Sequence, residues 1–410
     1  MNSIFFSTIN QTTKQIIGNI MKKLSIHVFR TVKIMVSSAL ISVSISSIPT
    51  LSTAFAEDIK IGVPLSLTGP FAFAGTKMKD AMELAFDEIN KSGYLSPNKL
   101  VPIYADDRSN QPQGISVTQQ LILRDKVSAI VGYTASNICQ ASLPVAQELK
   151  TPALQADCVV PGLNKIGNYV YSAVRPSDAF VELAIDKLVA ERKIKTAGII
   201  FQRDNPVFVN LQAVVTKAFE KNNVKIVASE PVTSGGDSDF SAQLTSIASG
   251  KPEVLVILLI GGQVGPAMIQ ARQTGMKETI FLGEQNFDSV EVRRVAGPNA
   301  DGSIFPSHWF AASTIPSNIK YVKDYQARFN RDPDTFSANG YNAVWMMAQI
   351  IKKAGKGDRE AIRSAMETIG EMDTIFGSVG KTTFKDRQVM LTPFFFTVKD
   401  GKVVPAFSRP

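Results

Sequence analysis

The sequence predicts an α/β fold built on parallel sheets, and three features of the chain lead to this prediction. Short apolar runs with the two-residue period of β-strands alternate with longer segments whose apolar residues recur every three or four positions. These helical segments span about ten to fifteen residues, which is long enough to connect neighbouring parallel strands. The run 254–260 (VLVILLI) is apolar throughout, which is typical of a strand covered on both faces.

The first strand and the first helix are separated by a loop of small, hydroxyl and aromatic residues. Apolar residues alternate with others over 59–65, which predicts a strand, and apolar residues at intervals of three and four over 78–89 predict an amphipathic helix. The loop 66–75 (SLTGPFAFAG) joins them, and its Gly-Pro pair predicts a sharp turn. We expect either Phe71 or Phe73 to face a ligand cleft; the alternative is that both pack beneath the helix.

The same unit of a strand followed by a helix recurs along the chain. The predicted strand and helix pairs are LVPIYADD with GISVTQQLILRD, VSAIVGYT with CQASLPVAQELK, TAGIIFQ with FVNLQAVVTKAFEK, and VLVILLI with GPAMIQARQTG, and TIFLGE is a further strand. In parallel sheets, ligands bind beyond the carboxyl ends of the strands. The loops at those ends contain few acids and are rich in Ser, Thr, Asn, Gln and Gly, so they predict a hydrogen-bonding site.

The first 56 residues have the pattern of a secretory signal. They contain five basic residues and no acidic residue, followed by an uncharged run from Ile34 that is rich in Val, Ile, Ser and Ala. The segment ends in Ala54-Phe55-Ala56, an A-x-A cleavage pattern. The serine content and this ending favour a cleaved signal over a membrane anchor. We therefore expect cleavage after Ala56 and a soluble exported protein.

The rest of the chain is nearly neutral and large enough for two domains. The full sequence has 44 basic and 36 acidic residues, and without the first 56 residues there are 39 basic and 36 acidic, a net charge of +3. No basic block remains, so nucleic-acid binding is not expected. The remaining 354 residues exceed the ~250–300 at which a single core stops growing.

The chain offers few residues for catalysis or metal binding. After the first 56 residues its one histidine is His308, so neither a catalytic histidine nor a histidine-rich metal site is expected. The segments 261–266 (GGQVGP) and 377–383 (GSVGKTT) lack the spacing of nucleotide-binding loops. We expect a binding protein without cofactor or metal, and not an enzyme. Cys139 and Cys158 either form a disulfide or remain buried thiols, because spacing alone does not decide between the two.

Several stretches together resemble the type I periplasmic solute-binding proteins of branched-chain amino acid-type ABC transporters. They are IKIGVPLSLTGPFAFAG, IVGYTAS, PEVLVILLIGGQ, FLGEQNFDSVEVRRVAG, ANGYNAVWMMAQIIKKAG and FGSVGKTTF. The resemblance covers about 59–405. It implies two Rossmann-like lobes with parallel central sheets, joined by a three-strand hinge, that close over a small molecule. Lobe 1 would hold 57–176 and 305–385, and lobe 2 would hold 177–304 and 386–410.

The resemblance also implies which residues line the cleft between the lobes. Ser136, at a helix N-terminus, would hold a ligand carboxylate with the help of neighbouring backbone N–H groups. A carboxylate that meets the ligand's amino group often occupies the position of Gln285. The implied ligand-binding residues are Phe73, Ala74, Ser136, Asp157, Cys158, Val207, Phe208, Gln263, Glu284 and Gln285.

This sequence departs from the family pattern at positions that decide which charge the cleft accepts. Gln285 is neutral although Glu284 adjoins it, Gln263 replaces an expected aromatic residue, and Asp157 adds an acid. A buried cation needs a partner charge, so an ordinary α-amino acid is expected only if Asp157 or Glu284 faces the cleft. Otherwise a carboxylate without an amine, or an amide, fits the Gln-rich wall better.

The resemblance implies a transport role. The protein, as a monomer, would capture a small polar carboxylate-bearing molecule, whether amino acid, amide or organic or aromatic acid, and deliver it to an inner-membrane ABC permease. The alternative is a ligand-sensing receptor subunit on the same fold that feeds a signalling partner. The absence of a nucleophile motif from the sequence disfavours a third reading, an α/β enzyme.

Overall fold

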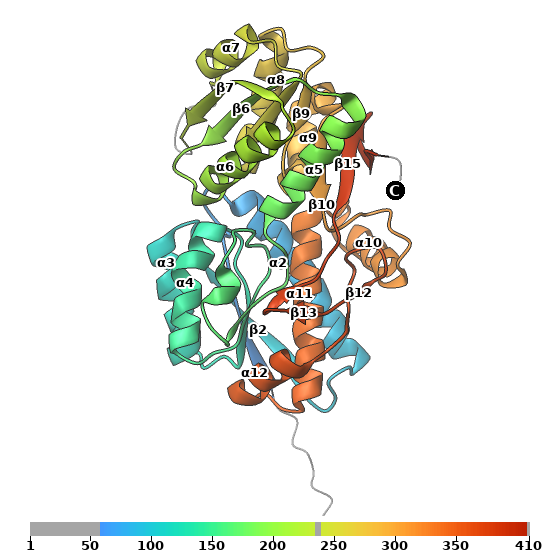
Figure 1. Cartoon of the computed structure of the whole chain (residues 1–410). Helices are drawn as coiled ribbons and strands as arrows, with labels where there is room; N and C mark the ends of the chain where they lie inside the picture. Colours follow the sequence, from blue (N-terminus) through green and yellow to red (C-terminus); the bar gives the residue numbers. More distant parts are fainter. Residues whose placement is uncertain (1–57, 234–238, 408–410) are drawn as a thin grey trace, which may run out of the picture. The chain divides into compact units, whose positions relative to one another are not determined.

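The computed structural model describes residues 58–233 and 239–407, so the predicted signal segment and its cleavage point lie outside the described residues. The described chain forms two lobes, each built on a seven-stranded sheet that is mainly parallel (Figure 1). No helix among the described residues is long and apolar enough to cross a membrane. The predicted α/β class with two parallel-sheet lobes is confirmed.

The first sheet has the strand order β13-β14-β5-β4-β3-β1-β2, in which β1 to β5 run parallel. Its strands are β1 (Asp58–Leu65), β2 (Lys99–Asp106), β3 (Ala129–Gly132), β4 (Ala153–Gln155), β5 (Val170–Ser172), β13 (Phe384–Lys385) and β14 (Gln388–Val389). The helices of this lobe are α2 (Ala72–Ser92), α3 (Gln111–Gln119), the π-helical turn η1 (Gln120–Arg124), α4 (Ser136–Glu148), the 3₁₀ turn η2 (Leu163–Lys165), α10 (Pro316–Phe329), α11 (Thr335–Ala354) and α12 (Arg359–Thr368).

The second sheet has the order β16-β15-β10-β9-β8-β6-β7, with an antiparallel pair at one edge. Its strands are β6 (Thr196–Gln202), β7 (Lys225–Val232), β8 (Val254–Leu258), β9 (Ile280–Leu282), β10 (Ile304–Ser307), β15 (Phe394–Lys399) and β16 (Lys402–Pro405). Its helices are α5 (Ser177–Arg192), α6 (Pro206–Lys221), α7 (Ser241–Ser249), α8 (Gly261–Gln273), α9 (Val290–Ala296) and the 3₁₀ turns η3 (Gln285–Asp288) and η4 (Gly297–Ala300). A hairpin of β11 (Met372–Asp373) and β12 (Lys381–Thr382) stands apart.

The chain passes from one sheet to the other three times, after β5, after β10 and after β14. These passages are the three crossover segments that the resemblance implied. We propose that the lobe limits follow the sheets, so that β10 belongs to the second lobe and β13 with β14 to the first. Limits set in this way differ from those derived from the sequence by a few residues.

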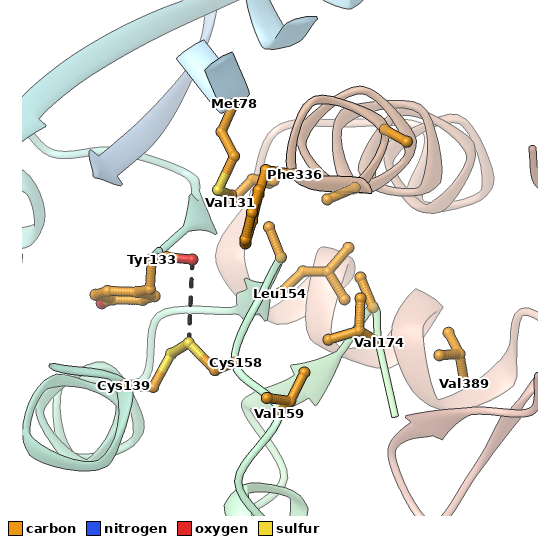
Figure 2. Packing of buried hydrophobic residues seen from close by; sticks show 14 of the residues in the cluster. Met78, Val131, Tyr133, Cys139, Leu154, Cys158, Val159, Val174, Phe336 and Val389 are labelled. Atoms are coloured by element: carbon orange, nitrogen blue, oxygen red, sulfur yellow. Dashed lines mark hydrogen bonds between the residues drawn. A yellow bond between two sulfur atoms is a disulfide. The ribbon is translucent and has the colours of Figure 1, made fainter. Parts of the chain in front are cut away.

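Burial follows from the parallel architecture. All five residues of β8 are buried, because helices cover both faces of a central parallel strand. In the first lobe, α11 packs along α2, and buried side chains such as Met78, Val131 and Leu154 fill the space beneath the helices (Figure 2). These packed layers hold the strand ends in place, and the loops at those ends build the site.

Candidate ligand-binding site

A cleft lies between loops of the two lobes, and the free space inside it is small, about 60 Å³. Each wall consists of strand-end loops and the helix N-termini that follow them, as the parallel sheets predict. The lining residues are Phe71, Phe73, Ala74, Thr134, Ala135, Ser136, Asn137, Asp157, Val159 and Phe336 from the first lobe, and Asn205, Val207, Phe208, Ile260, Gly261, Glu284, Gln285 and Asn286 from the second.

The loop after β1 is fixed by the two acids at the end of β2. The Asp106 carboxylate accepts hydrogen bonds from the backbone N–H groups of Leu67 and Thr68, and Ser66 Oγ donates to Asp107 at 2.6 Å. Gly69 has a φ of 83°, which a side chain would strain. Asp106 and Asp107 therefore have a structural role: they hold the turn that follows β1.

This turn brings phenylalanine rings to the cleft. Phe71 and Phe73 both line it, whereas we expected one of them. Phe73 packs edge to face against Phe336 at a centroid distance of 5.5 Å. A Cβ added at Gly261, at the start of α8, would lie 2.5 Å from the Phe73 ring. The absence of a side chain at Gly261 is what lets the second lobe approach this ring so closely.

The N-terminus of α4 offers hydrogen-bond donors to the cleft. Within the described chain, no residue accepts a hydrogen bond from the backbone N–H groups of Ser136 or Asn137. The Ser136 hydroxyl accepts a hydrogen bond from the Val159 N–H at 3.0 Å, which ties the helix start to the loop after β4. Free N–H groups and the positive end of a helix dipole suit an anion such as a carboxylate.

Two more helices begin at the opposite wall. The Asn205 side chain caps α6 by accepting from the Val207 N–H, and Pro206 occupies the first turn, a frequent position for proline. Helix α8 begins at Gly261 after Ile260, which has extended backbone. The cleft thus receives helix N-termini from both lobes.

Two acidic side chains, Asp157 and Glu284, also line the cleft, one from each lobe. Asp157 Oδ1 accepts hydrogen bonds from Asn339 Nδ2 at 2.5 Å and from Gln285 Nε2 at 3.3 Å. Glu284 Oε2 accepts one from Ser177 Oγ at 3.1 Å. Burial raises the pKa of Asp157 well above its usual range and raises the pKa of Glu284 to about 7.

No lysine, arginine or histidine from the described residues lines the cleft. By contrast Asp334, which is as deeply buried near the lobe junction, pairs with Lys77 at 2.8 Å. Neutral amides and hydroxyls thus support the two acids of the cleft, which lack the charged partner that buried carboxylates usually have. No group of three or more His, Cys, Asp or Glu residues that could hold a metal ion occurs in the described part of the chain.

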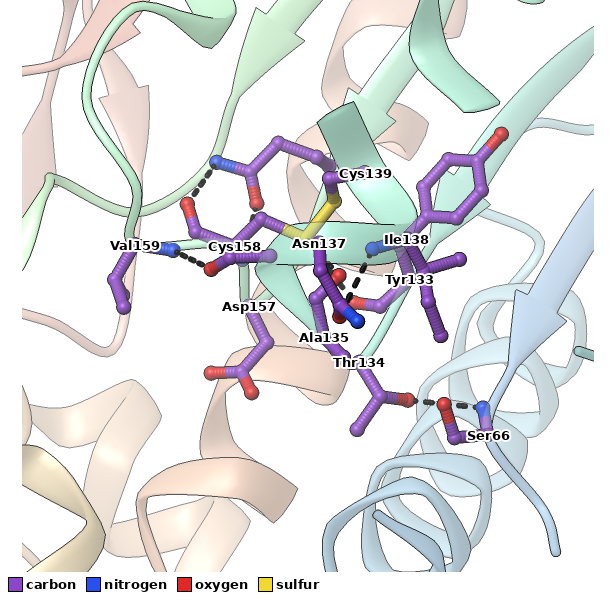
Figure 3. Close-up of a disulfide and its surroundings, with 12 residues drawn as sticks. Ser66, Tyr133, Thr134, Ala135, Asn137, Ile138, Cys139, Asp157, Cys158 and Val159 are labelled. Atoms are coloured by element: carbon purple, nitrogen blue, oxygen red, sulfur yellow. Dashed lines mark hydrogen bonds between the residues drawn. A yellow bond between two sulfur atoms is a disulfide. The ribbon is translucent and has the colours of Figure 1, made fainter. Parts of the chain in front are cut away.

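Eight of the ten residues named from the sequence lie on the cleft lining, and two do not. Cys158 adjoins Asp157 but points the other way, into a disulfide with Cys139 on α4, and the Cα atoms of the two cysteines lie 6.4 Å apart (Figure 3). Gln263 lies in the first turn of α8, where it accepts a hydrogen bond from Gln202 and donates to the Thr233 carbonyl. Both side chains therefore support the walls behind the lining.

The prediction missed several lining residues, and some of them carried a usable signal. Asn205 precedes Pro206 and opens a helix, a pattern that identifies an N-cap. Phe336 lies within a capping box formed by Asp334 and Ser337 at the start of α11. Nothing in the sequence near Phe336 indicates that this helix start lies beside the first loop, so only the folded chain brings it to the site.

Comparison with known proteins agrees with this architecture. A family model described as periplasmic binding protein matches residues 58–402. The Leu/Ile/Val-binding protein homolog 3 of Brucella melitensis is 27% identical over 356 residues, covering 86% of this chain and 94% of that protein. The Leu, Ile, Val, Thr and Ala-binding protein of Pseudomonas aeruginosa is 25% identical over 350 residues, covering 84% and 90%.

Solved structures show the same fold. The branched-chain amino acid transporter substrate-binding protein of Streptococcus pneumoniae, in complex with isoleucine, matches with a TM-score of 0.77 at 26% identity, covering 85% of this chain and 98% of that chain. An ABC transporter solute-binding protein of R. palustris, in complex with benzoate, also has a TM-score of 0.77, at 20% identity and with coverage of 85% and 95%. The second likeness concerns the fold alone.

Proposed function

The chain belongs to the periplasmic binding protein family, and we propose that it is the solute-binding receptor of an ABC importer that captures an amino acid-like molecule. The relatives named above bind amino acids, and their alignments span most of this chain. In this proposal the ligand enters the cleft between the lobes and the lobes close over it. The closed complex then delivers it to an inner-membrane permease.

The main support for the proposal is that one cleft contains both carboxylates, which attract cations, and free N–H groups, which attract anions. Asp157 and Glu284 line it without any cationic partner from the protein, and the free N–H groups of Ser136 and Asn137 line it as well. An ammonium group satisfies a buried carboxylate, and a carboxylate satisfies a helix N-terminus. Both acids line the cleft. From the sequence, we expect an amine-bearing ligand only if at least one of these two acids does so.

Closure has a physical basis in contacts that cross the cleft. Gln285 of the second lobe donates to Asp157 of the first, and the first turn of α8 meets the ring of Phe73. A ligand that touches both walls favours the closed arrangement by the difference in its affinity for the closed and open states. Residues on one wall alone would bind the ligand without driving closure.

The Streptococcus pneumoniae relative is named as a transporter substrate-binding protein, and this name favours transport over the sensing alternative. Uptake of the radiolabelled ligand separates the two roles. A strain without this protein should lose high-affinity uptake if the protein feeds a permease. Unchanged uptake, together with a lost transcriptional response to the ligand, would favour the sensor.

The binding proposal is tested by calorimetry on the purified protein after removal of any co-purified ligand. The panel pairs each amino acid with its analogue that lacks the amino group, for example leucine with 4-methylpentanoate. We expect measurable binding of amino acids and at least tenfold weaker binding of the matched acids. Only the amino acids carry an ammonium group that can pair with the carboxylates of Asp157 and Glu284. Equal binding of the amine-free acids would contradict the proposed site chemistry.

Export is tested separately by intact mass and N-terminal sequencing of the protein from the periplasm of an expressing bacterium. Cleavage after Ala56 gives a chain that begins at Glu57. A protein that retains its first residues in the membrane fraction would instead support an anchor.

A further inference from the structure

With both of its acids ionised, the cleft carries one more negative charge than a neutral amino acid can balance. A zwitterion brings one ammonium group and one carboxylate. The N–H groups at the start of α4 serve the carboxylate, and the ammonium neutralises one of the two acids that line the cleft. The second acid, either Asp157 or Glu284, then either stays protonated, because burial raises the pKa of both, or lacks a countercharge when it ionises.

We infer that the ligand carries a second cationic group, so that its class is a diamino acid or a guanidino amino acid, with one cation facing Asp157 and the other Glu284. This inference rests on the proposed function and narrows it. It depends on Asp157 and Glu284, which line the cleft from different lobes.

Each acid is held ready to accept a cation. The two side-chain amides that bind Asp157 both donate to Oδ1, and no described residue donates to Oδ2. Figure 3 shows the Asp157 carboxylate turned away from the Cys139–Cys158 disulfide, which anchors the neighbouring residue to α4. The disulfide and the two amides therefore fix the direction of the carboxylate without neutralising it.

On the other wall, Glu284 is also held by neutral hydrogen-bond donors and not by a cation. Its one side-chain donor is the Ser177 hydroxyl, at the start of α5, and the backbone N–H groups of Gln285 and Asn286 also donate to its carboxyl group. Because Asp157 and Glu284 belong to different lobes, a ligand with two cationic groups would place one on each lobe. Such a ligand favours closure more than one held through a single charge.

The remaining lining suits the carbon chain and the charges of such a ligand. Four phenylalanines line the cleft, and aromatic faces attract ammonium and guanidinium groups. The methylene groups of a lysine-like or ornithine-like ligand also pack well against these rings. The lining phenylalanines are Phe71, Phe73, Phe208 and Phe336.

The test compares L-lysine with L-norleucine, which has the same carbon chain and lacks the terminal amino group. Calorimetry on the purified protein at pH 8 should give a Kd for lysine at least tenfold lower than that for norleucine. Ornithine against norvaline is a second pair with a shorter chain, and arginine tests the guanidino case.

Two isosteric variants identify the partner of the terminal amino group. One of Asp157→Asn and Glu284→Gln should abolish the advantage of lysine and leave norleucine binding largely unchanged, while the other should weaken both ligands. Asp400→Asn and Glu220→Gln replace exposed acids outside the cleft and serve as matched controls that change neither ligand. Thermal unfolding of each variant shows whether it is folded.

The outcomes separate this inference from the proposed function. If norleucine and other neutral amino acids bind as tightly as lysine, the second cation is refuted, and the amino acid receptor stands. If the preference for lysine survives in both variants, the two acids do not provide it, and the inference fails. If only amine-free acids bind, both the inference and the proposed function are wrong.

Discussion

Binding of an amine-bearing ligand should weaken about tenfold when the pH falls from 8 to 6, and Glu284 should cause most of this change. Its carboxyl group is buried in the cleft, and burial raises its pKa to about 7 in the ligand-free protein. A ligand ammonium next to it stabilises the ionised form and lowers its pKa in the complex. Ligand binding therefore competes with proton binding.

The magnitude follows from the pKa of about 7. The free protein has Glu284 about nine-tenths ionised at pH 8 and about one-tenth ionised at pH 6. If the carboxylate stays ionised in the complex, the apparent Kd rises about tenfold over this interval, which equals about 1.4 kcal/mol. Asp157 acts in the same direction, because burial raises its pKa as well.

Calorimetry at pH 6, 7 and 8 and constant ionic strength measures this effect. At pH 7 the wild-type protein should also release about half a proton per ligand, visible as a dependence of the heat on the ionisation enthalpy of the buffer. Glu284→Gln should bind about 30-fold more weakly at pH 8, a loss of about 2 kcal/mol for a buried charge pair, and should have a flatter pH profile. Glu220→Gln, an exposed matched variant, should behave like wild type.

Two results would refute this reasoning. A Kd that stays constant from pH 8 to pH 6 would mean that Glu284 does not titrate against the ligand. A Glu284→Gln variant with the wild-type Kd and the wild-type slope would mean that another group meets the ammonium.

Three further predictions concern stability. Because burial raises the folded-state pKa of Glu284 to about 7 from an ordinary 4.5, the folded protein binds this proton more tightly than the unfolded chain. The unfolding free energy of the ligand-free protein should therefore fall by about 2.5 kcal/mol through this group between pH 5 and pH 8, a loss that urea titrations should not find in Glu284→Gln. Gly75→Ala should lower the unfolding free energy by about 2 kcal/mol or more, because its Cβ would lie 2.0 Å from the backbone oxygen of Ser66, just after β1. Gly262→Ala, inside helix α8, meets open space and should leave the unfolding free energy unchanged or raise it by up to about 1 kcal/mol. Replacing Cys139 and Cys158 together by serine should cost about 3 kcal/mol, as expected for a disulfide that closes a loop with a sequence separation of 19, and reduced wild-type protein should unfold at the same urea concentration as the variant.

Most of the fold could be predicted from the sequence, because each strand and helix of a parallel α/β fold has its own pattern of apolar residues. Each long strand and its helix carry their own period, and the unit repeats. Elements outside the repeating units were missed, and the longer ones among them are strand β7 and helices α5, α10 and α12. Elements with too few residues to display a period were missed as well. Strands β11 to β14 have two residues each, and the helical segment after β2 ends in the π-helical turn η1 rather than continuing as an α-helix. Only tertiary contacts define such elements.

Site residues could be predicted where the direction of a strand alone determines that the residue after it lies at the cleft. Asp157 and Glu284 follow strands of parallel sheets, so both lie at the edge where ligands bind. Cys158 lies outside the lining because its sulfur is bonded to Cys139 on α4, which holds this side chain away from the cleft. Gln263 lies outside it because it is two residues beyond Gly261 on a helix, and residues at that spacing face different sides.

The acids of the cleft link ligand binding to the stability of the protein. An ionised Glu284 without a partner lowers the unfolding free energy of the empty protein by about 2.5 kcal/mol at pH 8 relative to pH 5. A ligand at one hundred times its Kd adds about 2.7 kcal/mol, so an occupied cleft restores about what one ionised acid removes. A neutral side chain in place of Glu284 should therefore give an empty protein that is more stable at pH 8 and a complex that is weaker. If the variant instead lost both stability and affinity, Glu284 would be a structural residue of the second lobe, and the charge selection proposed for the cleft would rest on Asp157 alone.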